Sequence, residues 1–150
     1  RTQYSKSQNW TDVWVRNPGG STSGIDTEQP VEVVIQLEPS QTLQRPIVGI
    51  TIEDILGQRI CSFGTHYCGV TLPPIHSKSI LKCLIPELAL LPGTYYLNIG
   101  IGLPQEELLD AVYRAVSFTI YPRGDDEDVR MSGTVHGALR IPSSWEVVQE

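Results

Sequence analysis

The sequence is short of positive charge. Only 11 of its 150 residues are Lys or Arg, against 17 Asp and Glu, and the net charge is −6. Proteins that bind nucleic acid usually present a basic face, and anionic membranes attract the same kind of surface. The charge balance therefore argues against nucleic acid and against anionic membranes as partners.

Long apolar runs are also lacking. The longest is a handful of residues, too short to span a bilayer, and no signal-peptide pattern opens the chain. The chain begins at Arg1 and not at a methionine, so we expect a processed or excised piece of a longer protein, with room upstream for a targeting segment. Its 40% hydrophobic and 19% charged residues are typical of a globular domain with a real core.

Cysteine is scarce, with three residues at positions 61, 68 and 83. An odd number cannot all pair, which is more natural in a reducing compartment than in a disulfide scaffold. Cys61 and Cys68 flank Gly64 and could face each other across a hairpin. A single bridge between them therefore stays open as an alternative.

The common motifs of enzymes are missing. There is no glycine-rich phosphate loop followed by Lys, no Gly-x-Ser-x-Gly elbow, and no nucleophile beside any of the three histidines in an activating pattern. Glu106 and Glu107 are adjacent and point apart in most backbone geometries, so they make a poor glycosidase pair. We expect a protein that is not an enzyme and that needs no cofactor.

Two clusters could be argued into metal sites. Cys61, His66 and Cys68 have irregular spacing and lack a fourth zinc ligand. The acidic run at residues 125–128 lacks the alternating ligands of a calcium loop and is typical of a solvated connector. We predict no metal at either cluster.

The clearest strand signal lies in residues 88–101, after Pro92 and Gly93. Four apolar residues alternate on one face, namely Tyr95, Leu97, Ile99 and Ile101. The opposite face carries Tyr96, Asn98 and Gly100. Period-two alternation with aromatic and β-branched residues predicts a central strand that covers a core on one side and offers its outer face as a working surface.

The rest of the chain has the same character. Further strands are predicted at residues 11–17, 31–38, 47–54, 59–63, 80–85 and 113–121, with a last strand at about 133–141. We expect a frayed end at residues 1–10, a long loop at 64–77 and one helical turn within 103–111. Short strands separated by Gly and Pro turns predict an all-β, antiparallel two-sheet sandwich. Its division is a linker and first strand at 1–27, followed by the sandwich and its C-terminal strand at 28–150.

If the strands that follow Ile47, Thr94 and Tyr113 share one sheet, their outer face collects polar and aromatic side chains. Sugars present C–H patches and hydroxyls, which suit an aromatic platform with amide, carboxylate or hydroxyl partners. Gly49 and Gly100 would leave a groove among them. The predicted carbohydrate-binding residues are Thr51, Glu53, Tyr96, Asn98, Ser117, Thr119 and Tyr121, with His66, Arg114 and Tyr67 at the edges. Singly, each is more often ordinary surface; convergence on one face carries the prediction.

The order of several short motifs is distinctive. These motifs are residues 46–54 followed by Gly57, Thr65 and Gly69, then 85–88, 91–95 and 115–120, and finally Gly137 and Trp145. Together they resemble the C-terminal domain of Wzt, the nucleotide-binding subunit of ABC exporters for O-antigen polysaccharide. The resemblance covers roughly residues 28–145, and its motifs are packing and turn residues.

That resemblance implies an immunoglobulin-like sandwich that binds bacterial O-polysaccharide cargo. It implies a homodimer that exchanges its last strand, at the cytoplasmic face of the bacterial inner membrane. It also implies an ATPase domain in the same polypeptide and a transmembrane transporter subunit as partners. It assigns no sugar-binding residue, so those predictions come from the strand phases alone.

Two alternatives stay open. Residues 133–141 could close an edge of their own sheet or cross to a partner, and exchange is favoured mostly by the resemblance. The function could instead be that of an immunoglobulin-like protein-interaction or adhesin module. An extracellular origin, a Cys61–Cys68 bridge and glycosylation of Asn9, in Asn9-Trp10-Thr11, would favour that reading.

Overall fold

The protein is an all-β sandwich. The computed structural model describes residues 9–20, 24–103, 108–122 and 137–148, and these contain strands and no helix. The strands are β1 (Trp10–Arg16), β2 (Val31–Leu37), β3 (Ile47–Glu53), β4 (Arg59–Gly64), β5 (Ser79–Ile85), β6 (Gly93–Gly102) and β7 (Leu108–Ile120). Within the described residues, no helix is long and apolar enough to cross a membrane.

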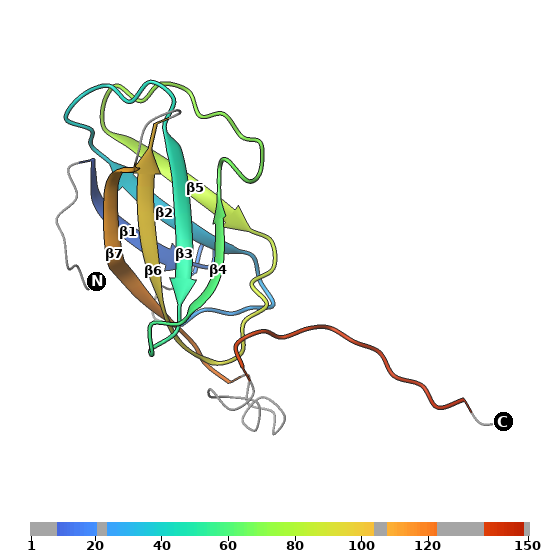
Figure 1. The fold of residues 1–150 in the computed structure, drawn as a ribbon. Coiled ribbons are helices and arrows are strands. Elements are labelled where there is room, and N and C mark those ends of the chain that lie inside the picture. The colour runs from blue at the N-terminus through green and yellow to red at the C-terminus, as the bar shows by residue number, and fades with distance from the viewer. Residues whose placement is uncertain (1–8, 21–23, 104–107, 123–136, 149–150) are drawn as a thin grey trace.

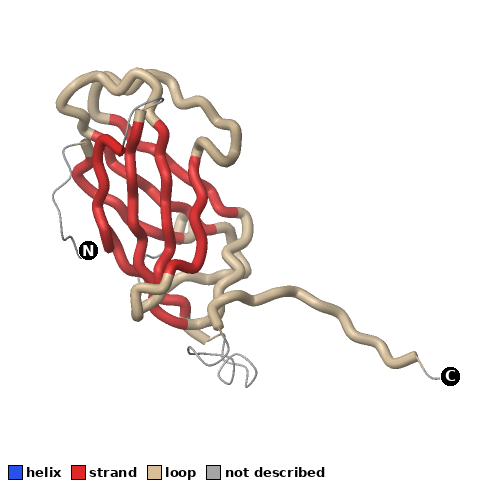
Figure 2. The backbone as a smooth tube through the Cα atoms, viewed as in Figure 1, coloured by secondary structure: helices blue, strands red, loops and turns tan. Residues whose placement is uncertain are grey.

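The strands form two antiparallel sheets that pack face to face (Figure 1, Figure 2). One sheet has the order β1-β2-β5 and the other the order β4-β3-β6-β7. The chain crosses between the sheets from β2 to β3, from β4 to β5 and from β5 to β6. This arrangement confirms the predicted immunoglobulin-like antiparallel sandwich.

The core lies between the sheets and follows the alternation of the strands. On β3, Val48, Ile50 and Ile52 are buried, as the period-two pattern predicts. On β6 the inward residues include Tyr95, whose hydroxyl donates to the Leu91 carbonyl oxygen at 2.6 Å. Burial raises the pKa of the Tyr95 phenol, because the charged form loses its solvation.

Strand β2 departs from simple alternation, because both of its faces are buried. It is the middle strand of its sheet, and its residue Val34 lies between the cross-strand neighbours Trp14 and Lys82. Its residue Glu32 pairs with Arg16 at 2.9 Å. Long side chains from both neighbours therefore cover positions that alternation alone would leave in solvent.

The expectation of a frayed, polar N-terminal end is wrong for Asn9 and Trp10, which are both buried. Trp10 opens β1 and fills the core. The Asn9 side-chain amide donates to the Asp110 carboxylate on β7 at 3.0 Å, and the main-chain carbonyl oxygen of Asn9 accepts the Glu38 N–H at 2.8 Å. These bonds tie the segment to both sheets. They also leave Asn9 poorly exposed for glycosylation.

The helical turn predicted within residues 103–111 is wrong where the chain is described. Residues 108–111 belong to β7, where Ala111 lies opposite Gly100 and Asp110 opposite Ile101. Pairing with β6 satisfies backbone groups that a single helical turn would leave open. Residues 104–107, with Glu106 and Glu107, lie outside the described part.

The strand predicted at residues 133–141 is reduced to one bridge in its described part. Leu139 pairs with Leu90, and two backbone hydrogen bonds of 2.8 Å flank the bridge. Beyond it, residues 141–148 are all exposed and run away from the sandwich as an extended arm (Figure 1). Residues 133–136 and the acidic run at 125–128 lie outside the described residues.

Candidate functional site

A row of small residues crosses the outer face of the four-stranded sheet. The register places Gly64 of β4 opposite Gly49 of β3, Gly49 opposite Gly100 of β6, and Gly100 opposite Ala111 of β7. These residues form the floor of a groove with a volume of about 460 Å³. The groove predicted at Gly49 and Gly100 is therefore present, and its size is typical of small-ligand sites.

Gly64 and Gly49, at one end of this row, lack a side chain for different structural reasons. A Cβ on Gly64 would lie 2.5 Å from the Val48 carbonyl oxygen, so the close approach of β3 and β4 excludes any side chain. A Cβ on Gly49 would have no neighbour within 4 Å. Packing therefore explains Gly64, whereas the missing side chain of Gly49 only keeps the groove open.

One wall of the groove is a tight turn that carries His66 and Tyr67. The Thr65 N–H donates to the Val48 carbonyl oxygen at 3.0 Å, and the Val48 N–H donates to the Thr65 hydroxyl at 3.1 Å. Gly69 has φ +67°, which completes the turn. Tyr67 is 76% exposed, and its ring meets that of His66 edge to face at 6.2 Å. The strand pairing thus fixes the base of an exposed aromatic wall.

The opposite wall is formed by Tyr113, which lies in a β-bulge of strand β7. The register between β6 and β7 shifts between Leu97 and Ile99, so that extra residues of β7 stand opposite Asn98. Arg114 lies in this bulge with φ +52°. Bulges re-aim neighbouring side chains, and here Tyr113 lines the groove while remaining 58% exposed.

Asn98 stabilises the bulge through two side-chain hydrogen bonds. Its Nδ2 donates to Glu53 Oε2 at 2.7 Å, and its Oδ1 accepts the Arg114 N–H at 2.8 Å. Although Asn98 lines the groove, it is only 8% exposed. The expectation of an open amide on this face is therefore wrong, because the extra residues of β7 cover it. Asn98 positions the bulge that carries Tyr113.

Tyr96, the aromatic platform expected from the sequence, is partly covered. The guanidinium of Arg114 lies 4.4 Å from the centre of its ring, a cation–π arrangement. One face of the ring is thus occupied by the protein itself. The exposed tyrosine rings of the groove are those of Tyr67 and Tyr113.

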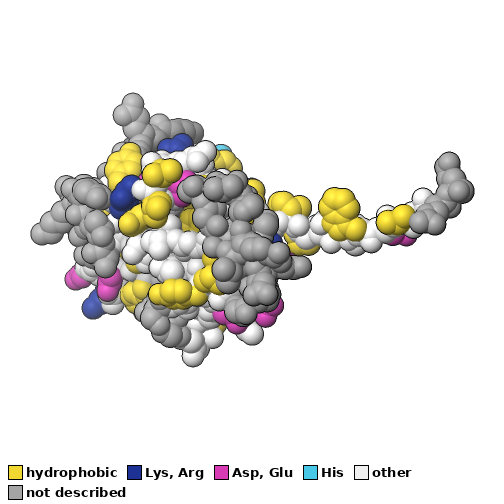
Figure 3. Space-filling model, turned by 90° about the horizontal axis from the view of Figure 1, so that it is seen from below, with side chains coloured by type: hydrophobic (Ala, Val, Ile, Leu, Met, Phe, Trp, Pro, Cys, Tyr) yellow, Lys and Arg dark blue, Asp and Glu magenta, His cyan; other side chains and the backbone are white. Residues whose placement is uncertain are grey.

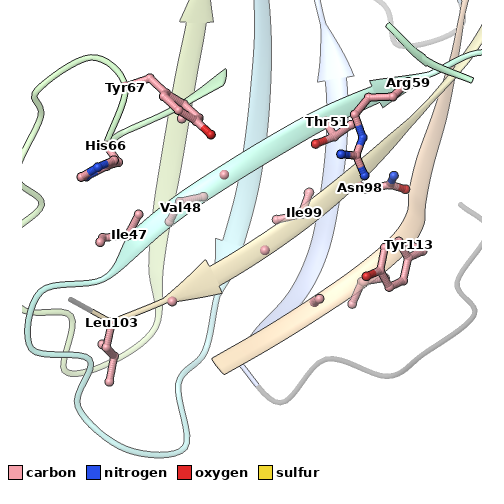
Figure 4. Close-up of a pocket in the computed structure, with 16 residues that line it drawn as sticks. Ile47, Val48, Thr51, Arg59, His66, Tyr67, Asn98, Ile99, Leu103 and Tyr113 are labelled. Atoms are coloured by element: carbon pink, nitrogen blue, oxygen red, sulfur yellow. The ribbon is translucent and has the colours of Figure 1, made fainter. Parts of the chain in front are cut away.

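The two ends of the groove differ in polarity. At one end the guanidinium of Arg59 extends over the sheet between Thr51 and Asn98, and at the other lie Ile47 and Leu103 (Figure 4). Arg59 is exposed. Among the residues that the structure describes, no carboxylate lies within ion-pair distance of its guanidinium.

The structure brings only some of the sequence-predicted site residues together. Those that line the groove are Thr51, Asn98, His66 and Tyr67. Four more share the outer face but lie outside the groove, namely Glu53, Tyr96, Arg114 and Ser117. Thr119 shares a hydroxyl hydrogen bond of 3.1 Å with Thr94. Tyr121 follows the end of β7 and lines a separate cavity with Gly24.

Sequence reasoning missed Arg59, Tyr113 and Leu103 as groove residues. Side chains on one face of a strand recur every second residue, so counting back from Ser117 reaches Tyr113. The alternation could therefore have predicted that Tyr113 lies on the outer face. Arg59 is the cross-strand partner of Glu53 and follows from the hairpin register. For Leu103 the sequence offers no comparable signal.

The cysteines do not form a metal site with His66. Cys61 packs against the core, on the opposite side of the sheet from the groove that His66 lines. Cys68 is exposed, and all three thiols are free. Over the described ranges, no group of three Cys, His, Asp or Glu side chains could hold a metal ion. Burial raises the pKa of the Cys61 and Cys83 thiols.

The fold and the groove define an immunoglobulin-like domain with an open, side-chain-poor trough across one sheet. The family model of the Wzt C-terminal domain matches residues 5–138. The chain therefore belongs to this family, whose members are parts of O-antigen transporter systems.

One solved structure supports the fold. The crystal structure of the C-terminal domain of Wzt is 16% identical, with a TM-score of 0.73, over 98% of this chain and 88% of that one. A CARDB domain from Pyrococcus furiosus, crystallised with di-metal ions, is 14% identical over 78% of this chain and 92% of that one, and its TM-score of 0.32 is too low for any argument. No curated protein matches the chain.

Proposed function

We propose that this domain binds O-antigen polysaccharide as the cargo of an ABC exporter and performs no chemistry on it. The proposed site is the groove on the β4-β3-β6-β7 sheet. The observation that carries the proposal is a floor of small residues between two exposed tyrosines, Tyr67 and Tyr113.

This geometry suits a sugar chain. Tyrosine rings offer flat apolar area for the C–H faces of sugars, together with a hydroxyl for hydrogen bonding. The hydroxyl of Thr51 and the ring of His66 add polar partners along the same groove. Because the floor of the groove has almost no side chains, a polysaccharide chain could lie along it and extend beyond both ends.

The affinity of one groove should be weak, on the order of micromolar to millimolar, because a shallow, wet site buries little apolar area. Two linked sites in a homodimer would raise the avidity for a repeating polymer without any new contact. Weak single-site binding combined with avidity suits a cargo that must be released.

Blocking the groove tests the proposal. Gly49→Val places a β-branched side chain in open space above the floor, in a strand that tolerates it. We expect retention of purified O-polysaccharide to fall by at least about tenfold while the chain stays folded. The matched control is Ser117→Val, which adds bulk on the same outer face outside the groove.

The readout is affinity electrophoresis or calorimetry against a panel of purified O-polysaccharides. Equal binding by wild type and Gly49→Val would remove the groove from consideration. Equal losses in Gly49→Val and Ser117→Val would indicate a general effect on the sheet and would contradict the assignment in the same way.

We also infer a homodimer in which the C-terminal segment reaches a second copy. The arm at residues 141–148 supports this inference, because Trp145 is 91% exposed and Ile141, Val147 and Val148 are exposed as well. Figure 3 shows hydrophobic side chains along this projecting arm. Apolar side chains gathered on one projecting segment are typical of an interaction surface. The strand exchange implied by the resemblance concerned residues 133–141, of which Leu139 pairs with Leu90 of the same chain. In the proposed dimer the arm beyond this bridge would contact the partner.

The further partners belong to the same proposal. Family membership supports an ATPase domain in the same polypeptide, a transmembrane transporter subunit, and a location at the cytoplasmic face of the bacterial inner membrane. The protein-interaction or adhesin alternative would be favoured by an extracellular origin, a Cys61–Cys68 bridge and a glycan on Asn9. With free thiols and a buried Asn9, nothing in the described residues favours it.

A further inference from the structure

The charge of the groove is opposite to the charge of the chain. The chain carries a net charge of −6, yet no Asp or Glu is among the described residues that line the groove. Arg59 lines it, so the charged side chain on the described lining is a cation. An arginine in a groove without lining carboxylates, on an acidic protein, favours ligands that carry negative charge.

Arg59 is available to a ligand. Its cross-strand neighbour Glu53 is a candidate partner. The carboxylate of Glu53 accepts the hydrogen bond from Asn98 instead, and no ion pair joins it to Arg59 among the described residues. The second arginine of this face, Arg114, is stacked on Tyr96 and held in the bulge. Arg59 is therefore the guanidinium that remains over the groove.

We infer that the groove selects an anionic saccharide, with Arg59 binding a carboxylate or phosphate on one sugar of the chain. This inference rests on the proposed function and adds the class of glycan. A guanidinium offers parallel N–H donors that match the two oxygens of a carboxylate or a phosphate. Tyr67 and Tyr113 would contact the sugar rings, and Arg59 would bind the anionic group.

The test compares acidic and neutral chains. Wild-type protein is offered a panel of purified bacterial O-polysaccharides, half containing uronic acid or phosphate and half neutral. We expect retention of acidic members and weakening of that retention as salt rises, since exposed charges are screened. The retained chain is then carboxyl-reduced or dephosphorylated, and the treatment that abolishes binding identifies which group carries the charge.

Two variants attribute the preference to one residue. Arg59→Gln should lower affinity for the acidic chain by about tenfold and leave the affinity for its neutralised form unchanged. The matched control is Lys82→Gln, which removes one exposed positive charge from the outer face of the other sheet. It should leave both affinities unchanged if the effect is local.

The outcomes separate this inference from the proposed function. If only neutral chains bind and Gly49→Val abolishes their binding, the groove stands and the anionic class is overturned. If Arg59→Gln and Lys82→Gln act equally, the role of Arg59 is overturned in favour of general charge. If wild type retains no polysaccharide, both this inference and the proposed function fail.

Discussion

Asn98 occupies an outward position on β6, yet its side chain serves the fold. The alternation of side chains along β6 correctly predicts that Asn98 points outward. It does not predict the extra β7 residues that cover Asn98. Its two hydrogen bonds join Glu53 on β3 to the bulge on β7. A polar residue on a sheet face is therefore a ligand candidate only after its partners are known.

Asn98→Ala should destabilise the protein. The substitution leaves the Arg114 N–H and the Glu53 carboxylate without their partner, at a cost of about 1–3 kcal/mol in the free energy of unfolding. Urea denaturation measures this change, with exposed Ser117→Ala as the control, expected within about 0.5 kcal/mol of wild type. Equal stability of the two variants would contradict the positioning role.

The three thiols should differ in reactivity. Burial raises the pKa of the Cys61 and Cys83 thiols, so less thiolate is present near neutral pH, whereas Cys68 is exposed. Iodoacetamide should alkylate Cys68 first, as followed by peptide mass spectrometry at pH 7.5. The folded state protects the other two, so denaturant should equalise the three rates. Faster labelling of Cys61 in native protein would contradict its inward placement.

Among the elements, the alternation of β3, β6 and β7 could be read from the sequence, since each has one apolar face. The bulge at Arg114 could not, because it depends on the register between two strands distant in the chain. The walls of the groove depend on that bulge and on the pinned turn at His66 and Tyr67. For the same reason the sequence indicated a groove at Gly49 and Gly100, but it could not show that Tyr96, the expected aromatic platform, lies outside that groove.

Two facing glycines give a test at the scale of a strand pair. Gly64→Ala forces a Cβ against the β3 backbone and should lower the free energy of unfolding by about 1–3 kcal/mol. Gly49→Ala meets open space and should be neutral or stabilising by up to about 1 kcal/mol, because alanine loses less backbone entropy. Thermal or urea unfolding of both variants measures the difference. The opposite order would contradict the register of β3 and β4.

In the whole molecule, the two-sheet fold followed from the spacing of strands and turns. The burial of Trp10 and the arm at residues 141–148 did not, because each depends on what lies beside the segment and not on its own pattern. Trp10 is surrounded by core residues. The arm has exposed apolar side chains and no comparable surroundings within the described residues.

Removal of residues 142–150 should separate folding from association. All of the described residues in this segment are exposed, so the unfolding transition of the shortened chain should stay close to that of the full chain. We expect the 150-residue chain to be dimeric and the shortened chain to be monomeric, because in the proposed dimer the arm would supply the apolar contact. Light scattering coupled to gel filtration measures both masses. Identical masses would contradict the role of the arm.

The glycine floor bears on how this domain can vary. Because the floor of the groove consists of three glycines and one alanine, it is almost entirely main chain, and strand pairing maintains it. The groups that would discriminate between ligands, Tyr67, Tyr113 and Arg59, occupy exposed positions whose exchange costs the fold little. Substitutions at these three positions could therefore change which ligand the domain prefers without unfolding the sandwich.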